Sequence, residues 1–149
     1  MKTLFNPKDR EALSLRLAAL EPDAQRQWGR MNAAQMLAHC AIALEVAAGD
    51  RPMPQAFLGK LITPLFGRMI LGERPFSRDS PTNPSFVVTD LRDFEAERIR
   101  VATLIDRVVQ HGPESAGRQT HPFFGRLSGD QWGRLAHKHL DHHLRQFGV

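Results

Sequence analysis

Four segments with the 3.6-residue spacing of apolar side chains are the feature that most constrains the fold of this 149-residue chain. Such spacing is typical of amphipathic helices, and no segment shows the strict alternation of a half-buried strand. Residues 86–88 are at most a short extended piece. We therefore expect an all-α fold, a helical bundle, in one domain over residues 1–149. The expected helices cover residues 7–20, 33–48, 90–112 and 128–147.

Capping residues set the ends of these helices. Asn6 before Pro7 starts the first, Asn32 starts the second, and Gly49 ends the second. Ser128 and Gln131 have capping-box spacing at the start of the last helix, which Gly148 ends. The third helix is expected to begin near Asp90 and to stop at Gly112-Pro113. Its expected buried face is Leu91, Phe94, Val101, Leu104, Ile105 and Val108.

Two long loops and one less regular segment lie between the helices. Residues 54–71 are apolar, and Pro64 should kink or split any short additional helix there. Residues 72–85 are rich in proline, glycine, serine and threonine, which favours a loop. A second loop is expected after Gly112-Pro113, ending near Gly125.

Composition excludes several classes of protein. Apolar residues make up 42% and charged residues 24% of the chain, which argues against disorder. The net charge is +4 without a run of basic residues, so no nucleic-acid partner is expected. No apolar stretch has the length of a membrane span and no signal-peptide core is present, so we expect no membrane partner and a cytoplasmic location. With Cys40 as its single cysteine, the chain forms no intrachain disulfide.

Histidine is unusually concentrated near the end of the chain. Four of the seven histidines fall in the last 13 residues: His137, His139, His142 and His143. On a helical wheel, His139 and His143 lie in the middle of the apolar stripe that contains Trp132 and Phe147. His142 lies on its flank, and His137 falls on the expected polar side.

Two imidazoles at positions i and i+4 on one helix face can share a metal ion. The metalloprotease motif has the same spacing, but its glutamate is absent here. A hydrogen-bonded, interfacial or pH-sensing pair would also satisfy both rings. A third ligand would have to come from another helix, and His39 is the best candidate. Cys40 points about 100° away from His39, so it is interpreted as a small buried hydrophobic residue.

His121 and His142 are further candidates, either as a fourth ligand or as residues that orient a ligand. His121 precedes a proline in a loop, where a packing role is the simpler interpretation.

Three segments resemble the DinB/YfiT-like superfamily of metal-binding four-helix bundles, and within it a branch of unknown function: MNAAQMLAHCAIALEV, THPFFGRLSGDQWG and HKHLDHHLRQFG. The resemblance implies that His39, His139 and His143 bind a divalent ion, zinc or nickel. It also implies a homodimer. Some members are thiol-dependent transferases or isomerases, which implies a low-molecular-weight thiol as a possible cosubstrate, although no thiol-binding pocket is identifiable in the sequence.

Three functions remain open at this stage. An enzyme would use the ion to lower the pKa of a bound water or thiol, for thiol transfer or hydrolysis of an unknown small molecule. Its catalytic residues are unknown, because Glu45 and Asp141 fall opposite the expected buried faces. A non-catalytic module would use the ion for stability or sensing. A metal-free bundle would associate through the apolar segment 57–76.

Overall fold

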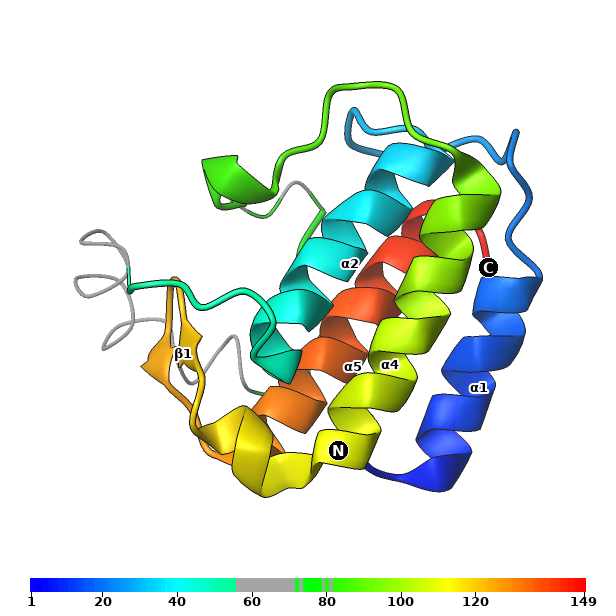
Figure 1. The fold of residues 1–149 in the computed structure, drawn as a ribbon. Coiled ribbons are helices and arrows are strands. Elements are labelled where there is room, and N and C mark those ends of the chain that lie inside the picture. The colour runs from blue at the N-terminus through cyan, green and yellow to red at the C-terminus, as the bar shows by residue number, and fades with distance from the viewer. Residues whose placement is uncertain (56–71, 73, 79, 81) are drawn as a thin grey trace.

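The computed structural model describes residues 1–55, 72, 74–78, 80 and 82–149, and this part of the chain is mostly helical (Figure 1). Four α-helices, one short 3-10 helix and a small two-stranded sheet are present in it. The all-α expectation is therefore correct in class, apart from this sheet. The elements are α1 (Pro7–Ala18), α2 (Ala33–Ala48), η1 (Pro84–Phe86), α4 (Phe94–Gly117), β1 (Thr120–His121), β2 (Gly125–Arg126) and α5 (Gly129–Gln146).

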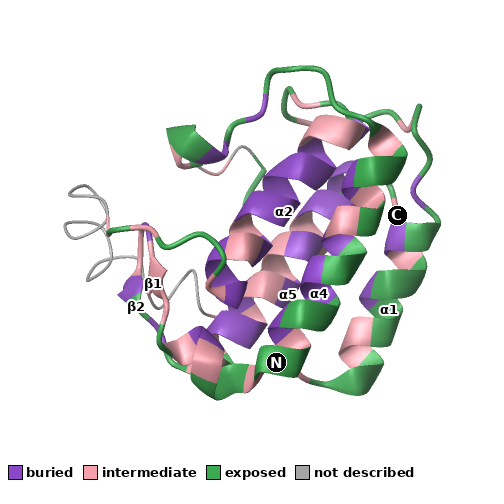
Figure 2. Ribbon diagram, in the orientation of Figure 1, coloured by how far each residue is buried: buried purple, intermediate pink, exposed green. Residues whose placement is uncertain are grey.

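Helix α2 is the most buried of the described helices. It packs against both α4 and α5, α4 also packs against α5, and α1 packs against α5. Buried residues cover most of the α2 surface in Figure 2, as expected for a helix that is apolar on nearly all sides. The buried apolar side chains of the described residues form a cluster that draws on all four helices. None of the described helices combines the length and apolar character needed to cross a membrane.

The helix caps predicted from the sequence are confirmed. The Asn6 side chain accepts hydrogen bonds from the first turn of α1, and Asn32 and Ser128 each form a complete capping box. Gly49 ends α2 in the left-handed conformation, at φ +88°. Each cap depends on residues within one turn of the helix end, which explains why the caps can be predicted from the sequence without knowledge of the fold.

The third helix begins later than predicted, whereas its predicted stop at Gly112-Pro113 coincides with a break in the helix. Asp93 caps α4, so the helix begins at Phe94, and Leu91 lies outside it with 96% of its surface exposed. At the other end the predicted stop agrees with the structure, because Gly112 has non-helical angles of φ +77° and ψ 173°; the sequence missed only that the chain resumes helical structure from Pro113 to Gly117. Proline is tolerated there because its missing N–H falls in the first turn after the kink.

The turn after the kink packs directly on the start of α5. A Cβ atom built on Gly129 would lie 1.9 Å from the carbonyl oxygen of Pro113. Only glycine allows this close backbone approach.

The two loop regions contain short regular elements. Thr120 pairs with Arg126 and His121 with Gly125 in an antiparallel hairpin, where the sequence predicted only a loop. Of the short extended piece expected at residues 86–88, Phe86 is buried and ends η1, whereas Val87 is extended. The predicted kink at Pro64 lies outside the described residues. So does most of the proposed association segment 57–76, of which Phe76 is partly buried against the core.

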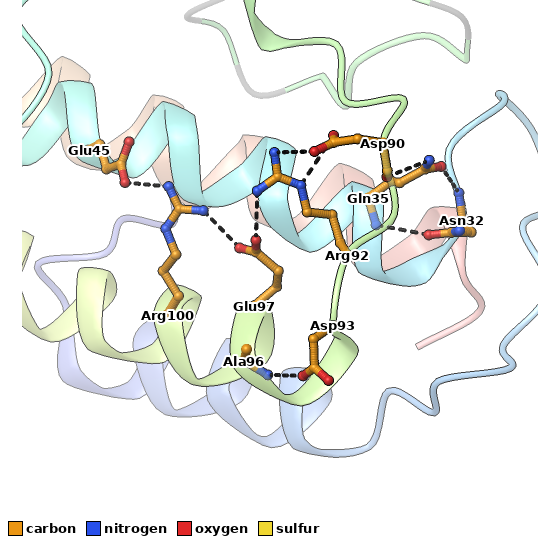
Figure 3. Close-up of polar contacts among 9 residues, drawn as sticks. All are labelled: Asn32, Gln35, Glu45, Asp90, Arg92, Asp93, Ala96, Glu97 and Arg100. Atoms are coloured by element: carbon orange, nitrogen blue, oxygen red, sulfur yellow. Dashed lines mark hydrogen bonds and ion pairs between the residues drawn. The ribbon is translucent and has the colours of Figure 1, made fainter.

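A chain of ion pairs links α2 to α4 and to the residues just before α4 (Figure 3). Arg100 pairs with Glu45 of α2 and, at 2.8 Å, with Glu97. Glu97 also pairs with Arg92 at 3.2 Å, and Arg92 pairs with Asp90 at 3.0 Å. The network links the segment between η1 and α4 to both helices, and η1, which directly precedes this segment, supplies a contact to the site described next.

Candidate metal centre

Three histidine side chains meet in the interior between α2 and α5. His39 comes from the middle of α2, and His139 and His143 lie one turn apart on the face of α5 that packs against it. One ring nitrogen from each lies within 4.8 Å of the other two. Ring centroids are 4.7–4.9 Å apart. Among the described residues this is the one group of histidine, cysteine or carboxylate side chains arranged closely enough to hold a metal ion.

The His39 ring is oriented by a backbone carbonyl. Its Nδ1 lies 2.9 Å from the carbonyl oxygen of Phe86. A carbonyl only accepts hydrogen bonds, so Nδ1 carries the proton and donates. In the neutral ring, Nε2 therefore keeps its lone pair, and this nitrogen faces the other two histidines.

The His143 ring is oriented by Gln146. The Gln146 amide Nε2 donates to the carbonyl oxygen of Trp28 at 2.7 Å, which directs its Oε1 toward His143 Nδ1 at 2.9 Å. His143 Nδ1 must then donate, which leaves Nε2 of the neutral ring as a free ligand atom. Histidine ligands of metal ions are usually held by such outer hydrogen bonds.

Burial keeps the three rings neutral. It lowers the pKa of His39, partly opposed by the hydrogen bond to Phe86, and it lowers the pKa of His143 to about 3. The pKa of His139 is well below its usual value, first through burial and then through repulsion by the neighbouring histidines. Neutral imidazole is the form that binds a metal, so the rings lose no net proton at neutral pH. His139 Nε2–H donates to His39 Nε2, so this proton would shift to His139 Nδ1 when Nε2 binds an ion.

The spacing of the nitrogens suits a shared ion. His39 Nε2 and His139 Nε2 are 2.9 Å apart. Two nitrogens bound at about 2.0–2.1 Å in tetrahedral geometry lie roughly 3.3 Å apart, so a small outward shift of either ring accommodates an ion. His139 is only partly buried, while His39 and His143 are almost fully buried. Of the three histidines, His139 is therefore the one nearest to solvent, and an ion or small molecule would enter the site beside it.

His121 lies outside the group of three. Its Nδ1 accepts backbone hydrogen bonds from Phe123 and Phe124, and its ring stacks on Phe124 with centroids 4.4 Å apart. The ring also lies 5.3 Å from Trp132. These contacts give His121 a packing role in the β1–β2 hairpin.

His142 also lies outside the group, with its ring edge-on to His143 at 5.1 Å. The helical wheel placed it on the flank of α5, and the structure shows it between Trp28 and Phe76.

The helical wheel placed His137 on the polar side of the last helix, and this prediction is wrong. The residue is buried, with an exposed fraction of 6%. The wheel assumes one buried face, but the N-terminal residues cover a second face of α5. There the Leu4 N–H donates to the Gly133 carbonyl at 3.1 Å.

Two other side-chain assignments from the sequence agree with the structure. Cys40 is buried, its Sγ lies 3.7 Å from Met36 Sδ, and burial raises the pKa of its thiol. Glu45 and Asp141 face away from the histidines and pair with arginines. Sequence reasoning missed Gln146 and the Phe86 carbonyl. For Gln146 a signal was present, because it follows His143 by three residues on the same helix.

Comparison with known proteins gives one match. A family model described as a protein of unknown function (DUF1569) matches residues 4–148. No curated protein and no solved structure matches the chain.

Proposed function

The chain belongs to the DUF1569 family of proteins of unknown function, and we propose that it binds one divalent metal ion through Nε2 of His39, His139 and His143. The observation that carries this proposal is the fixed orientation of two rings. His39 and His143 each donate Nδ1–H to an acceptor outside the cluster, so the nitrogens with lone pairs point to a common centre. Isolated buried histidines need no such convergence.

Zinc and nickel are the proposed ions, since imidazole nitrogen suits both. Three protein ligands leave a coordination position open, which is the arrangement of catalytic rather than structural zinc sites. An ion there would lower the pKa of a bound water or thiol. The proposed reaction class is therefore thiol transfer or hydrolysis of a small molecule, with a low-molecular-weight thiol as one candidate cosubstrate.

We further propose that the fold is the four-helix bundle of the DinB/YfiT-like superfamily. Two observations support this assignment. The described residues form the helices α1, α2, α4 and α5, and of the three clustered histidines one lies on α2 and two lie on α5. The same likeness underlies the proposal of a homodimer. Light scattering of the purified chain tests it, and a monomeric mass would refute it.

The metal site is tested by metal content and by matched variants. We expect elemental analysis of protein supplemented with nickel or zinc to give close to one ion per chain. His139→Ala and His143→Ala should abolish binding, whereas His137→Ala should retain it because His137 is buried on another face of α5. Circular dichroism confirms that each variant is folded.

The outcomes separate the alternatives. No bound ion after supplementation, or equal losses in all three variants, would refute the site. Cobalt spectroscopy of the loaded protein counts the ligands. Three nitrogens plus solvent would support catalysis, and four protein ligands would favour the non-catalytic alternative.

A further inference from the structure

A depression of about 440 Å³ opens beside the three histidines, at the end of α5. Trp28, Phe76 and His142 line it together with Arg78 and Arg145. Its volume falls within the range of small-molecule sites. His142 separates it from the candidate metal centre, since the His142 ring is 5.1 Å from that of His143.

The walls of the depression are flat and aromatic. The His142 ring lies 5.5 Å from Trp28 and 5.8 Å from Phe76, so the three rings form adjoining surfaces. The Trp28 indole Nε1–H is buried and has no acceptor among the described residues. The flat aromatic walls favour a planar apolar group.

The charge in the depression comes from two arginines. The Arg78 guanidinium lies 4.9 Å from the centre of the Trp28 ring and makes no ion pair with a carboxylate of the described residues. Arg145 is already paired with Asp141 at 3.0 Å. Arg78 is therefore the better placed residue for an incoming anion, and guanidinium groups suit carboxylates and phosphates.

We propose that this depression binds a small organic anion with a planar apolar body. The body lies against Trp28 and Phe76, and Arg78 holds the anionic group. The identification of this ligand as the substrate rests on the proposed metal-dependent function. The two sites are also connected, since the Trp28 carbonyl holds the Gln146 amide that orients His143.

The probe is 2-naphthoate, titrated into the full-length chain by calorimetry, with 2-naphthamide as its neutral counterpart and acetate as an anion without the apolar body. We expect 2-naphthoate to bind at least tenfold more tightly than either. Arg78→Gln should weaken 2-naphthoate about tenfold or more, because a charge-assisted hydrogen bond is lost, and should leave 2-naphthamide unchanged. The matched control is Arg98→Gln, which removes a half-buried arginine of α4 that pairs with Glu95 and should change neither titration.

Absence of 2-naphthoate binding, equal binding of the amide, or equal losses in the Arg78 and Arg98 variants would overturn the proposal. Each titration is made on the protein as purified and after chelation, and nickel binding is measured separately. Nickel bound without 2-naphthoate would overturn this proposal alone. Binding of 2-naphthoate by a chain that takes up no metal would overturn the proposed function and leave the anion site standing.

Discussion

Gln146 connects the loop at Trp28 to the His143 ring and is 97% buried, since its exposed fraction is 3%. Its amide fixes which His143 nitrogen carries the proton. Replacement by the similarly sized Gln146→Met removes this acceptor. We expect metal affinity to fall by about 10–100-fold, the usual effect of losing an outer hydrogen bond to a histidine ligand. Calorimetry with nickel measures the change.

The control is Gln110→Met on the exposed side of α4, which should bind nickel as the unmodified chain does. An unchanged affinity in Gln146→Met would show that the hydrogen bond does not orient the ligand.

Buried neutral histidines make the fold sensitive to acid. Burial lowers the pKa of both His121 and His143 from 6.5 to about 3. Between these values the unfolded chain binds protons that the folded chain does not, so the free energy of unfolding of the metal-free chain falls as pH decreases below about 6.5. Each such histidine contributes up to about 1.4 kcal/mol per pH unit. We expect urea unfolding from pH 7 to pH 4 to show this decline and His121→Asn to reduce its slope. Equal slopes for the unmodified chain and the His121→Asn variant would contradict a neutral His121 in the folded chain.

At the residue scale, helical periodicity placed His139 and His143 on one face, because it is regular over one or two turns. His39 was chosen as the other histidine inside a helical pattern near the apolar stripe, and the family resemblance implied the same three residues. The same wheel failed for His137. Its burial depends on the N-terminal residues folding back on α5, which is a long-range contact without a periodic signal.

At the element scale, the ion-pair chain between α2 and α4 has one buried member. The Glu97 side chain is 9% exposed and lies between Arg92 and Arg100. We expect Glu97→Gln to lower the free energy of unfolding by about 2 kcal/mol, because two arginines lose a largely desolvated partner. Urea denaturation gives this value.

Glu95→Gln is the matched control on the same helix, since Glu95 is 59% exposed and Arg98 is its one ion-pair partner among the described residues. Its effect should stay below about 0.5 kcal/mol. An equal decrease in the free energy of unfolding in both variants would mean that the burial of Glu97 does not strengthen its ion pairs.

Element boundaries followed from the sequence wherever one residue determines them. Asn32 and Ser128 cap helices through their own side chains, and both predictions are confirmed. The start of α4 was predicted too early because Leu91 fits the apolar spacing, although Asp93 provides the cap. The Gly112-Pro113 pair was interpreted as a stop, and Gly112 does break the helix, but helical structure resumes from Pro113 to Gly117, where Pro113 packs on Gly129 at the start of α5.

At the scale of the whole molecule, metal binding and folding should be coupled, because the proposed ligands come from α2 and α5. An ion that binds only the folded chain stabilises it by about 2.7 kcal/mol at 100 times its Kd. For a domain of this length we expect nickel to raise Tm by about 5–10 °C and a chelator to reverse the shift. Differential scanning calorimetry measures it. The double variant His139→Ala/His143→Ala should show no shift, and a shift of the same size there would place the ion elsewhere.

The close approach of Pro113 to Gly129 has an evolutionary consequence. The left-handed step at Gly112 brings the Pro113 carbonyl to a place where no side chain at position 129 can coexist with it. A homologue that lost the glycine-proline step would release that restriction and could accept larger residues at position 129. An alignment of family members should therefore show positions 112, 113 and 129 changing together, because all three take part in one backbone contact.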